Sequence, residues 1–264
     1  MCRLFYFIQN PDTISILHMK KILIIQSRAR PEMLHAEQGE YTRAIGSAAH
    51  TDFISSLNES LEWNTPPHML AGYDAVMLGG SGEFDFDGGR SVDDSARITS
   101  SHIVVRIRSL ILYILEKDIP LLGICYGHQI ISEVLGVPVL HDASQKKVGT
   151  FPVALTDAGK SDAIFSDLPE IFMAQYGHKD SVSALPPGAV VLAESAQCRF
   201  SALRYGNHVY TTQFHPELTQ KDIAWKLQNS PGYLPQGVSV ESIAKPSIEA
   251  SSIIPKFIER IVKE

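Results

Sequence analysis

Cysteine is scarce in this sequence of 264 residues, which contains only Cys2, Cys125 and Cys198. An odd and sparse set of this kind excludes a disulfide framework and lacks the spacing of a zinc site. It is typical of a reducing compartment, where a lone thiol is available as a nucleophile. We therefore expect a cytoplasmic protein that holds no metal and needs no cofactor.

Long apolar runs and an excess of basic charge are also missing. No run approaches the ~18 residues that a membrane-spanning helix requires, so no membrane association is expected. The formal net charge of −6 disfavours nucleic acid as a main partner, because phosphate binding calls for a basic face. Residues 1–18 hold a short apolar stretch without a small-residue cleavage site, which makes them a poor signal peptide. We expect residues 1–18 to be an N-terminal extension and residues 19–264 to form a single domain.

The first half of the chain alternates between buried strands and helices. Continuous apolar runs are typical of strands buried on both faces of a parallel sheet, and they span residues 21–26, 73–78 and 121–125. Helices are predicted over residues 37–58, over 102–117, where apolar residues recur at helical spacing, and from Gly127 to Leu135 before the terminating Gly136. This alternation predicts an α/β fold with a mostly parallel central sheet and helices on both faces.

The second half predicts a small antiparallel β portion. Short β-type runs separated by turn residues span residues 148–155, 190–194, 200–205 and 208–214. The last two runs are joined at Gly206-Asn207 and are typical of a hairpin. A closing amphipathic helix is predicted at about 249–263, after an irregular segment at about 229–247. In the first half, residues 83–100 are polar and rich in Gly and Asp, and loops of that length are usually functional or mobile.

One cysteine stands where a buried strand meets a helix, in the stretch Gly123-Ile124-Cys125-Tyr126-Gly127. Glycines two positions away on each side allow the sharp turn of a nucleophile elbow, which projects the side chain above the sheet edge. The start of a helix carries about half a positive charge and stabilises a thiolate. Its unpaired N–H groups can also receive a developing oxyanion. Alone, the pattern fits a buried core cysteine equally well.

A second motif, His215-Pro216-Glu217, ends a predicted strand. Side chains at i and i+2 of an extended chain point the same way, and the proline stiffens the spacing. A carboxylate beside an imidazole orients the ring and supports its protonated form. Such a triplet alone is more often a surface turn, but with an elbow cysteine elsewhere in the chain it predicts a catalytic triad of Cys125, His215 and Glu217.

A third motif, Gly79-Gly80-Ser81-Gly82, follows another predicted strand. Loops at the carboxyl ends of parallel strands line the ligand crevice, although a plain tight turn explains the glycines equally well. In this order the three motifs resemble those of the class I (triad) glutamine amidotransferase family, whose nucleophile motif G-x-C-x-G-x-Q ends here at Gln129. Ser81 stands where many members have proline. The segment 177–180 and the run 164–169 resemble regions of glutaminase domains from GMP synthases.

The resemblance covers about residues 20–220 and implies a flavodoxin-like sheet and a mechanism. Cys125 would attack the side-chain amide carbon of glutamine and form a glutamyl thioester. Backbone N–H groups of Gly80 and Tyr126 would hold the oxyanion, and the Tyr126 hydroxyl would line the pocket. His215, oriented by Glu217, would protonate the departing ammonia and then activate the hydrolytic water.

The resemblance also implies the substrate contacts and a partner. Gly82 and Gln129 would bind glutamine, and main-chain groups of Lys179 and Asp180 would receive its α-amino and α-carboxylate groups. Family members commonly pass ammonia to a synthase, which would be a separate partner here. Two alternatives stay open: a γ-glutamyl peptidase that uses the same triad, and a non-catalytic binding or regulatory protein. Residues 221–245 match no family motif.

Overall fold

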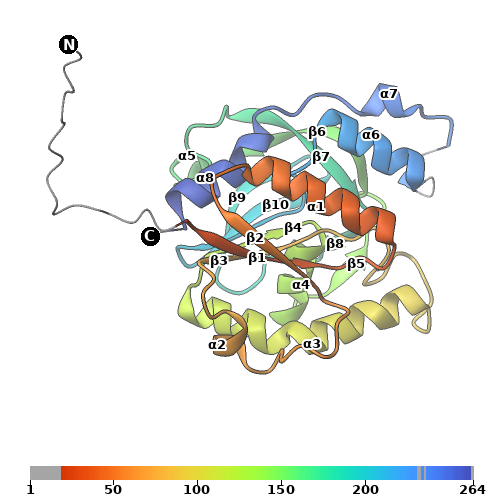
Figure 1. Cartoon of the computed structure of the whole chain (residues 1–264). Coiled ribbons are helices and arrows are strands. Elements are labelled where there is room, and N and C mark those ends of the chain that lie inside the picture. The colour runs from red at the N-terminus through yellow and green to blue at the C-terminus, as the bar shows by residue number, and fades with distance from the viewer. Residues whose placement is uncertain (1–18, 231–232, 235, 263–264) are drawn as a thin grey trace, which may run out of the picture.

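The computed structural model describes residues 19–230, 233–234 and 236–262, so the predicted extension at residues 1–18 lies outside the described residues. A nine-stranded sheet runs through the middle of the molecule in the order β2-β1-β3-β4-β11-β10-β9-β6-β7 (Figure 1). Its first five strands pair in parallel, and they are β2 His50–Ser55, β1 Lys21–Gln26, β3 Ala75–Leu78, β4 Leu121–Ile124 and β11 Val209–Thr212. The predicted fold class is confirmed.

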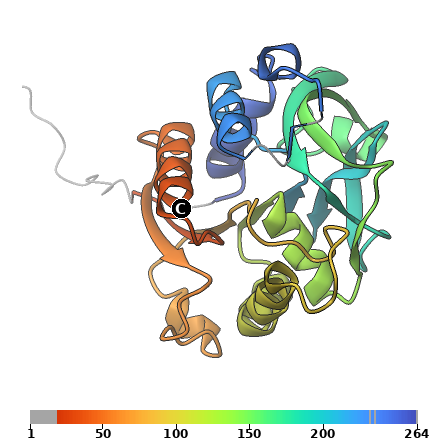
Figure 2. The same cartoon turned by 90° about the vertical axis from the view of Figure 1, so that its right-hand side faces the viewer.

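The sheet continues from β11 as an antiparallel extension, which Figure 2 shows on the side away from α1. Its strands are β10 Cys198–Tyr205, β9 Ala189–Ser195, β6 Lys147–Leu155 and β7 Ile171–His178. The predicted hairpin is confirmed, since β10 and β11 pair through a turn in which Gly206 has a φ of 56°. A separate two-stranded antiparallel sheet joins β5 Val139–His141 to β8 Asp180–Val182.

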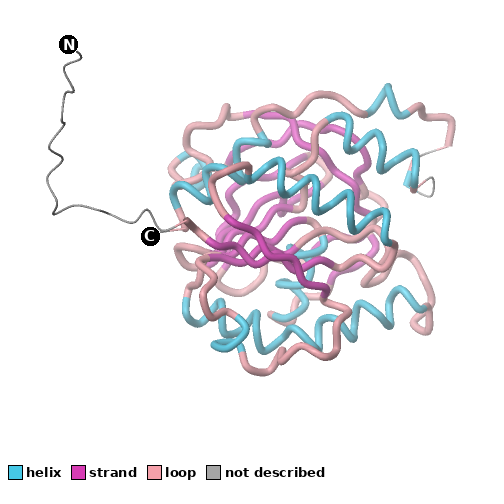
Figure 3. Tube along the Cα trace, viewed as in Figure 1, coloured by secondary structure: helices cyan, strands magenta, loops and turns pink. Residues whose placement is uncertain are grey.

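Helices cover both faces of the sheet, as the tube view also shows (Figure 3). One face carries α1 Pro31–Ile45, α6 Gln220–Asn229 and α8 Ile253–Arg260, which follows the 3-10 turn Ala250–Ser252. The other carries α2 Pro66–Met69, α3 Ser95–Lys117 and α4 Tyr126–Val134. The short helices α5 Asp157–Lys160 and α7 Val240–Ile243 lie in connections.

The alternation of side chains along β1 divides the core into two layers. Ile22 and Ile24 pack with the α1 and α8 layer, whereas Leu23 and Ile25 pack with the α3 and α4 layer. A strand buried on both faces therefore needs a continuous apolar run, which is the pattern that the sequence shows. The carboxyl ends of the parallel strands all meet at one edge of this core, and the candidate site lies there.

Two predicted boundaries are wrong. Residues 37–58 are not one helix, because α1 ends at Ile45 before Gly46 with a φ of 58°, and His50–Ser55 form the edge strand β2. The half-exposed edge strand alternates too weakly to be distinguished from a helix. The predicted loop 83–100 ends early, because the Asp94 side chain accepts a hydrogen bond from the Ala96 N–H at 2.9 Å and caps α3.

The long helix α3 meets the length and hydropathy of a membrane-spanning helix, although no single apolar run suggested it. Its apolar side is fully buried in the core of this domain at Ile103, Ile107, Leu110, Ile111 and Ile114. The central helix of a globular domain meets the same two criteria, and α3 is such a core helix.

Candidate active site

Cys125 occupies a strained turn between β4 and α4. Its φ of 51° and ψ of −95° are unusual for a residue with a side chain, and its N–H donates to the Thr212 carbonyl at 2.7 Å. A Cβ on Gly127 would lie 2.5 Å from the Leu78 carbonyl oxygen, and one on Gly123 would lie 3.0 Å from the Gly127 backbone. Both glycines are therefore required for the close approach of strand and helix, and the predicted elbow is present.

His215 lies across from the elbow with a carboxylate behind it. Its Nδ1 lies 2.6 Å from Glu217 Oε1, and its backbone N–H donates to the Gln175 carbonyl at 2.8 Å. Both side chains are buried. Burial disfavours the charged ring, but the Glu217 carboxylate, the Cys125 thiolate and hydrogen bonds to both outweigh it and raise the pKa of His215 to about 10.

Gly80 lies where the elbow and the imidazole meet. A Cβ there would lie 2.9 Å from His215 Cε1 and 3.7 Å from Cys125 Cβ. Any side chain at this position would displace the ring, so the loop that leaves β3 needs glycine here. The structure thus brings the three predicted triad residues and Gly80 together.

Tyr126 contributes only its main chain to this edge of the sheet. It is the first residue of α4, a position at which the backbone N–H has no intrahelical acceptor. Its hydroxyl hydrogen-bonds with Ser100 Oγ at 2.9 Å, and its ring stacks on Phe86 with centroids 5.1 Å apart. The expectation that the Tyr126 hydroxyl lines the pocket is therefore wrong, because the side chain is buried beneath the loop after β3.

A small pocket of about 220 Å³ opens at the Cys125 side chain and receives most of the predicted substrate residues. Gln129 Nε2 donates to the Asp180 carbonyl at 2.8 Å and to Gln213 Oε1 at 3.2 Å. Lys179 Nζ lies 3.3 Å from Asp85 Oδ2. The pocket is lined by Ser81, Phe84, Asp85, Cys125, Gln129, Gly177, His178, Lys179, Asp180 and Tyr233.

The Asp180 side chain holds the loop that follows β3. Its carboxylate accepts backbone N–H groups of Phe86, Asp87 and Gly88 at 3.0, 2.9 and 2.7 Å. Hydrogen bonds to an ionised acceptor are about twice as strong as neutral ones. The carboxylate therefore orders the loop, while the Asp180 main chain faces Gln129. This role of the side chain was not predicted from the sequence.

Two further residues at the site escaped the sequence analysis. Gln213 Nε2 lies 3.6 Å from Cys125 Sγ, and the alternation of side chains along a strand could have grouped Gln213 with His215. Tyr233 comes from the segment without a family motif, and its ring lies 4.7 Å from Lys179 Nζ. Its hydroxyl would lie 3.6 Å from a Cβ on Gly82, which places the predicted residue Gly82 against Tyr233. No local pattern marks Tyr233.

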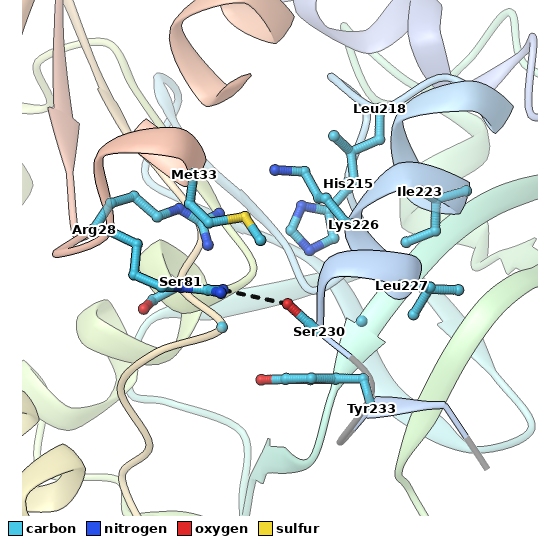
Figure 4. Close-up of a pocket in the computed structure, with 13 residues that line it drawn as sticks. Arg28, Met33, Ser81, His215, Leu218, Ile223, Lys226, Leu227, Ser230 and Tyr233 are labelled. Atoms are coloured by element: carbon cyan, nitrogen blue, oxygen red, sulfur yellow. Dashed lines mark hydrogen bonds between the residues drawn. The ribbon is translucent and has the colours of Figure 1, made fainter. Parts of the chain in front are cut away.

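A second and larger pocket of about 480 Å³ opens on the His215 side of the triad (Figure 4). Arg28 and Arg30 after β1 and Met33 of α1 form one wall. The opposite wall comes from α6 and its flanks, and the remaining lining residues are Ser81, Gly82, Gly177, His215, Leu218, Ile223, Lys226, Leu227, Ser230 and Tyr233.

Buried ion pairs support the wall of this second pocket. Arg28 Nη2 lies 2.9 Å from Glu37 Oε1, and Lys226 Nζ lies 3.0 Å from Glu40 Oε2. Burial raises the pKa of Glu40 to about 7, although Lys226 opposes the shift. Among the residues that the structure describes, no group of three or more His, Cys, Asp or Glu side chains is arranged to hold a metal ion.

Comparison with known proteins places this geometry in a family. Residues 100–227 match the family model described as glutamine amidotransferase class-I. One relative is the A chain of the two-part, glutamine-hydrolysing GMP synthase of Archaeoglobus fulgidus, which is 30% identical over 159 residues, covering 60% of this chain and 74% of the relative. Its counterpart in Methanopyrus kandleri is 37% identical over 105 residues, covering 39% of this chain and 54% of the relative.

Solved structures show the same fold. A glutamine amidotransferase from Thermotoga maritima superposes with a TM-score of 0.65 at 21% identity, covering 94% of this chain and all (100%) of that chain. The chain spans about half (54%) of the M. kandleri relative and about a fifth (19%) of the GMP synthase of Thermomicrobium roseum. On the strength of these matches and of the motifs that meet at the sheet edge, the chain belongs to the class I glutamine amidotransferase family.

Proposed function

We propose that the chain hydrolyses the side-chain amide of glutamine to glutamate and ammonia through Cys125, His215 and Glu217. The observation that supports this most directly is the buried His215 ring, which has Glu217 on Nδ1 and the Cys125 thiol as its other polar neighbour. A ring with a pKa of about 10 is protonated at neutral pH. It can therefore stabilise a thiolate on Cys125 and has a proton to give.

In the first half-reaction the Cys125 thiolate attacks the amide carbon of glutamine bound in the smaller pocket. The backbone N–H groups of Gly80 and Tyr126 receive the negative charge that develops on the amide oxygen. His215 donates its proton to the nitrogen as the C–N bond breaks, and ammonia leaves. The product on the enzyme is a glutamyl thioester.

In the second half-reaction water hydrolyses the thioester. The imidazole, now neutral, accepts a proton from the water as its oxygen attacks the thioester carbon. Collapse of the tetrahedral intermediate releases glutamate and returns the thiolate beside a protonated His215. Glu217 keeps the ring in one tautomer and orientation throughout, in the manner of the third member of a triad.

The substrate's α-amino and α-carboxylate groups would bind in the smaller pocket. Main-chain groups of Lys179 and Asp180 lie at its rim, and Gln129 ties the Asp180 carbonyl in place. Gly82 lets the loop after β3 approach this pocket. Because the A. fulgidus and M. kandleri relatives are named as subunits of a synthase, we propose that ammonia passes to a separate synthase partner in the cytoplasm.

An ammonia-release assay on the purified protein tests the proposal. We expect glutamine to give glutamate and ammonia in equal amounts, and Cys125→Ala to abolish both products while circular dichroism shows an intact fold. Unreduced ammonia release by the Cys125→Ala protein would contradict the assigned nucleophile. An inactive wild-type protein that also fails to react with a glutamine-like electrophile would contradict the glutaminase function.

A further inference from the structure

The pocket beside His215 is larger than glutamine hydrolysis requires. It encloses about 480 Å³ of space, against about 220 Å³ for the pocket at Cys125. Ammonia is similar in size to a water molecule, whose share of liquid volume is about 30 Å³. A pocket of several hundred Å³ is instead typical of one that binds a small organic ligand.

The two pockets lie on opposite sides of the reacting bond. They share Ser81, Gly177 and Tyr233, but only the smaller is lined by Cys125 and only the larger by His215. The glutamyl part must sit on the Cys125 side, where its carbonyl carbon is attacked. The leaving nitrogen takes its proton from His215, so a substituent on that nitrogen extends into the larger pocket.

The walls of the larger pocket show which substituent fits. Figure 4 shows Met33 on one side and Ile223 and Leu227 on the other, with the His215 ring between them. These side chains offer an apolar surface to the body of a ligand. The charged residues in the lining are the cations Arg28, Arg30 and Lys226, together with His215, and among the described residues the lining contains no carboxylate.

Arg30 is the cation best placed to meet a ligand. Arg28 and Lys226 are buried against Glu37 and Glu40, whereas the Arg30 side chain is 41% exposed. Its Nη2 donates to Ser230 Oγ at 3.3 Å, so it reaches from the loop after β1 to the end of α6 (Figure 4). A guanidinium in this position suits a carboxylate, to which it can form two parallel hydrogen bonds.

We propose that the site also hydrolyses γ-glutamyl amino acids whose leaving amino acid has an apolar side chain, an inference that rests on the proposed triad chemistry. The Cys125 sulfur bonds to the γ-carbonyl carbon, the C–N bond breaks, and His215 gives its proton to the leaving α-amino nitrogen. Water then hydrolyses the thioester, so one water is consumed and glutamate and a free amino acid are released. The apolar side chain binds between α1 and α6, and the α-carboxylate binds Arg30.

Three γ-glutamyl substrates and glutamine test the pocket's chemistry. γ-Glutamyl-leucine has both features, γ-glutamyl-glycine lacks the apolar side chain, and the γ-glutamyl amide of isopentylamine lacks the carboxylate. We expect the wild-type kcat/KM for γ-glutamyl-leucine to exceed that of each of the other two by about tenfold or more, since a charged hydrogen bond contributes about 1.5–3 kcal/mol. Arg30→Ala should reduce the preference for leucine over isopentylamine by about tenfold. The matched control Arg108→Ala, an exposed arginine on α3, should leave the preference unchanged.

The outcomes separate this inference from the glutaminase proposal. Hydrolysis of glutamine without hydrolysis of γ-glutamyl-leucine overturns the inference and leaves the glutaminase function in place. Hydrolysis of γ-glutamyl-leucine without glutamine supports the inference and overturns the glutaminase function. Equal kcat/KM for the leucine and isopentylamine substrates, or an Arg30→Ala protein with an unchanged preference, overturns the assignment of Arg30. Activity towards none of the four substrates overturns both proposals.

Discussion

Replacing Glu217 with glutamine tests the electrostatics of the proposed triad. The carboxylate lies 2.6 Å from the His215 ring in a buried site and supports a pKa of about 10 there. Removing an opposite charge at such a distance lowers a pKa by about 1–3 units, which corresponds to about 1.4–4 kcal/mol. Because His215 must be protonated to release the leaving group, the wild-type rate should fall as pH rises through about 10. In Glu217→Gln this alkaline limb should lie at about pH 7–9.

Ammonia release measured from about pH 6 to about pH 11 gives both the position of the limb and the loss of rate. We expect kcat of Glu217→Gln to fall by a factor on the order of 10²–10⁴, the range found for triad carboxylates in other enzymes. Glu116→Gln is a matched control, because Glu116 is an exposed carboxylate on α3 paired with Lys117. An unmoved alkaline limb with less than about a threefold change in kcat would refute the reasoning.

The same substitution should change stability in a pH-dependent way. A histidine whose pKa is raised by folding stabilises the folded state fully below its unfolded pKa of about 6.5, and this contribution is lost as pH rises through about 10. The difference in free energy of unfolding between wild type and Glu217→Gln should therefore narrow between about pH 6 and about pH 10.5. Urea unfolding at the two pH values measures it, and a difference that widens with pH would contradict the assigned ion pair.

Three further predictions address the nucleophile, the oxyanion loop and the loop after β3. A glutamine-like electrophile should label Cys125 and spare Cys198, because burial raises the pKa of the Cys198 thiol to about 11; equal labelling by mass spectrometry would count against the site. Gly80→Ala should lower kcat about 100-fold by displacing the catalytic ring, whereas Gly39→Ala, with open space at its Cβ in α1, should keep activity and add about 0.5–1 kcal/mol of stability. Asp180→Asn should raise KM for glutamine about tenfold by weakening its three contacts to the loop, and an unchanged KM would separate that loop from substrate binding.

The parts of the fold that the sequence predicts well are those with a local cause. The β1 run is continuous and apolar because both of its faces are buried, and the turn at Cys125 needs glycines because Leu78 comes within 2.5 Å of a Cβ on Gly127. The i and i+2 spacing of His215 and Glu217 likewise determines their contact. Each of these features can be derived from a few neighbouring residues.

The features that escape prediction depend on partners distant in sequence. His50–Ser55 form a strand because β1 offers a parallel edge, although their own pattern is weak. Asp180 orders a loop that lies far earlier in the chain, and Tyr233 reaches the site from a segment without a motif. The pocket beside His215 combines residues after β1 with residues of α6, so only the assembled fold reveals it.

The most direct test of the account is to trap the covalent intermediate on Cys125. Glutamine is mixed with the protein, the reaction is quenched in acid within one turnover, and the peptides are analysed by mass spectrometry. The account predicts a glutamyl group on the peptide that contains Cys125, lost on treatment with hydroxylamine and absent from Cys125→Ala. Steady ammonia release with no such adduct, undiminished in the Cys125→Ala protein, would contradict it.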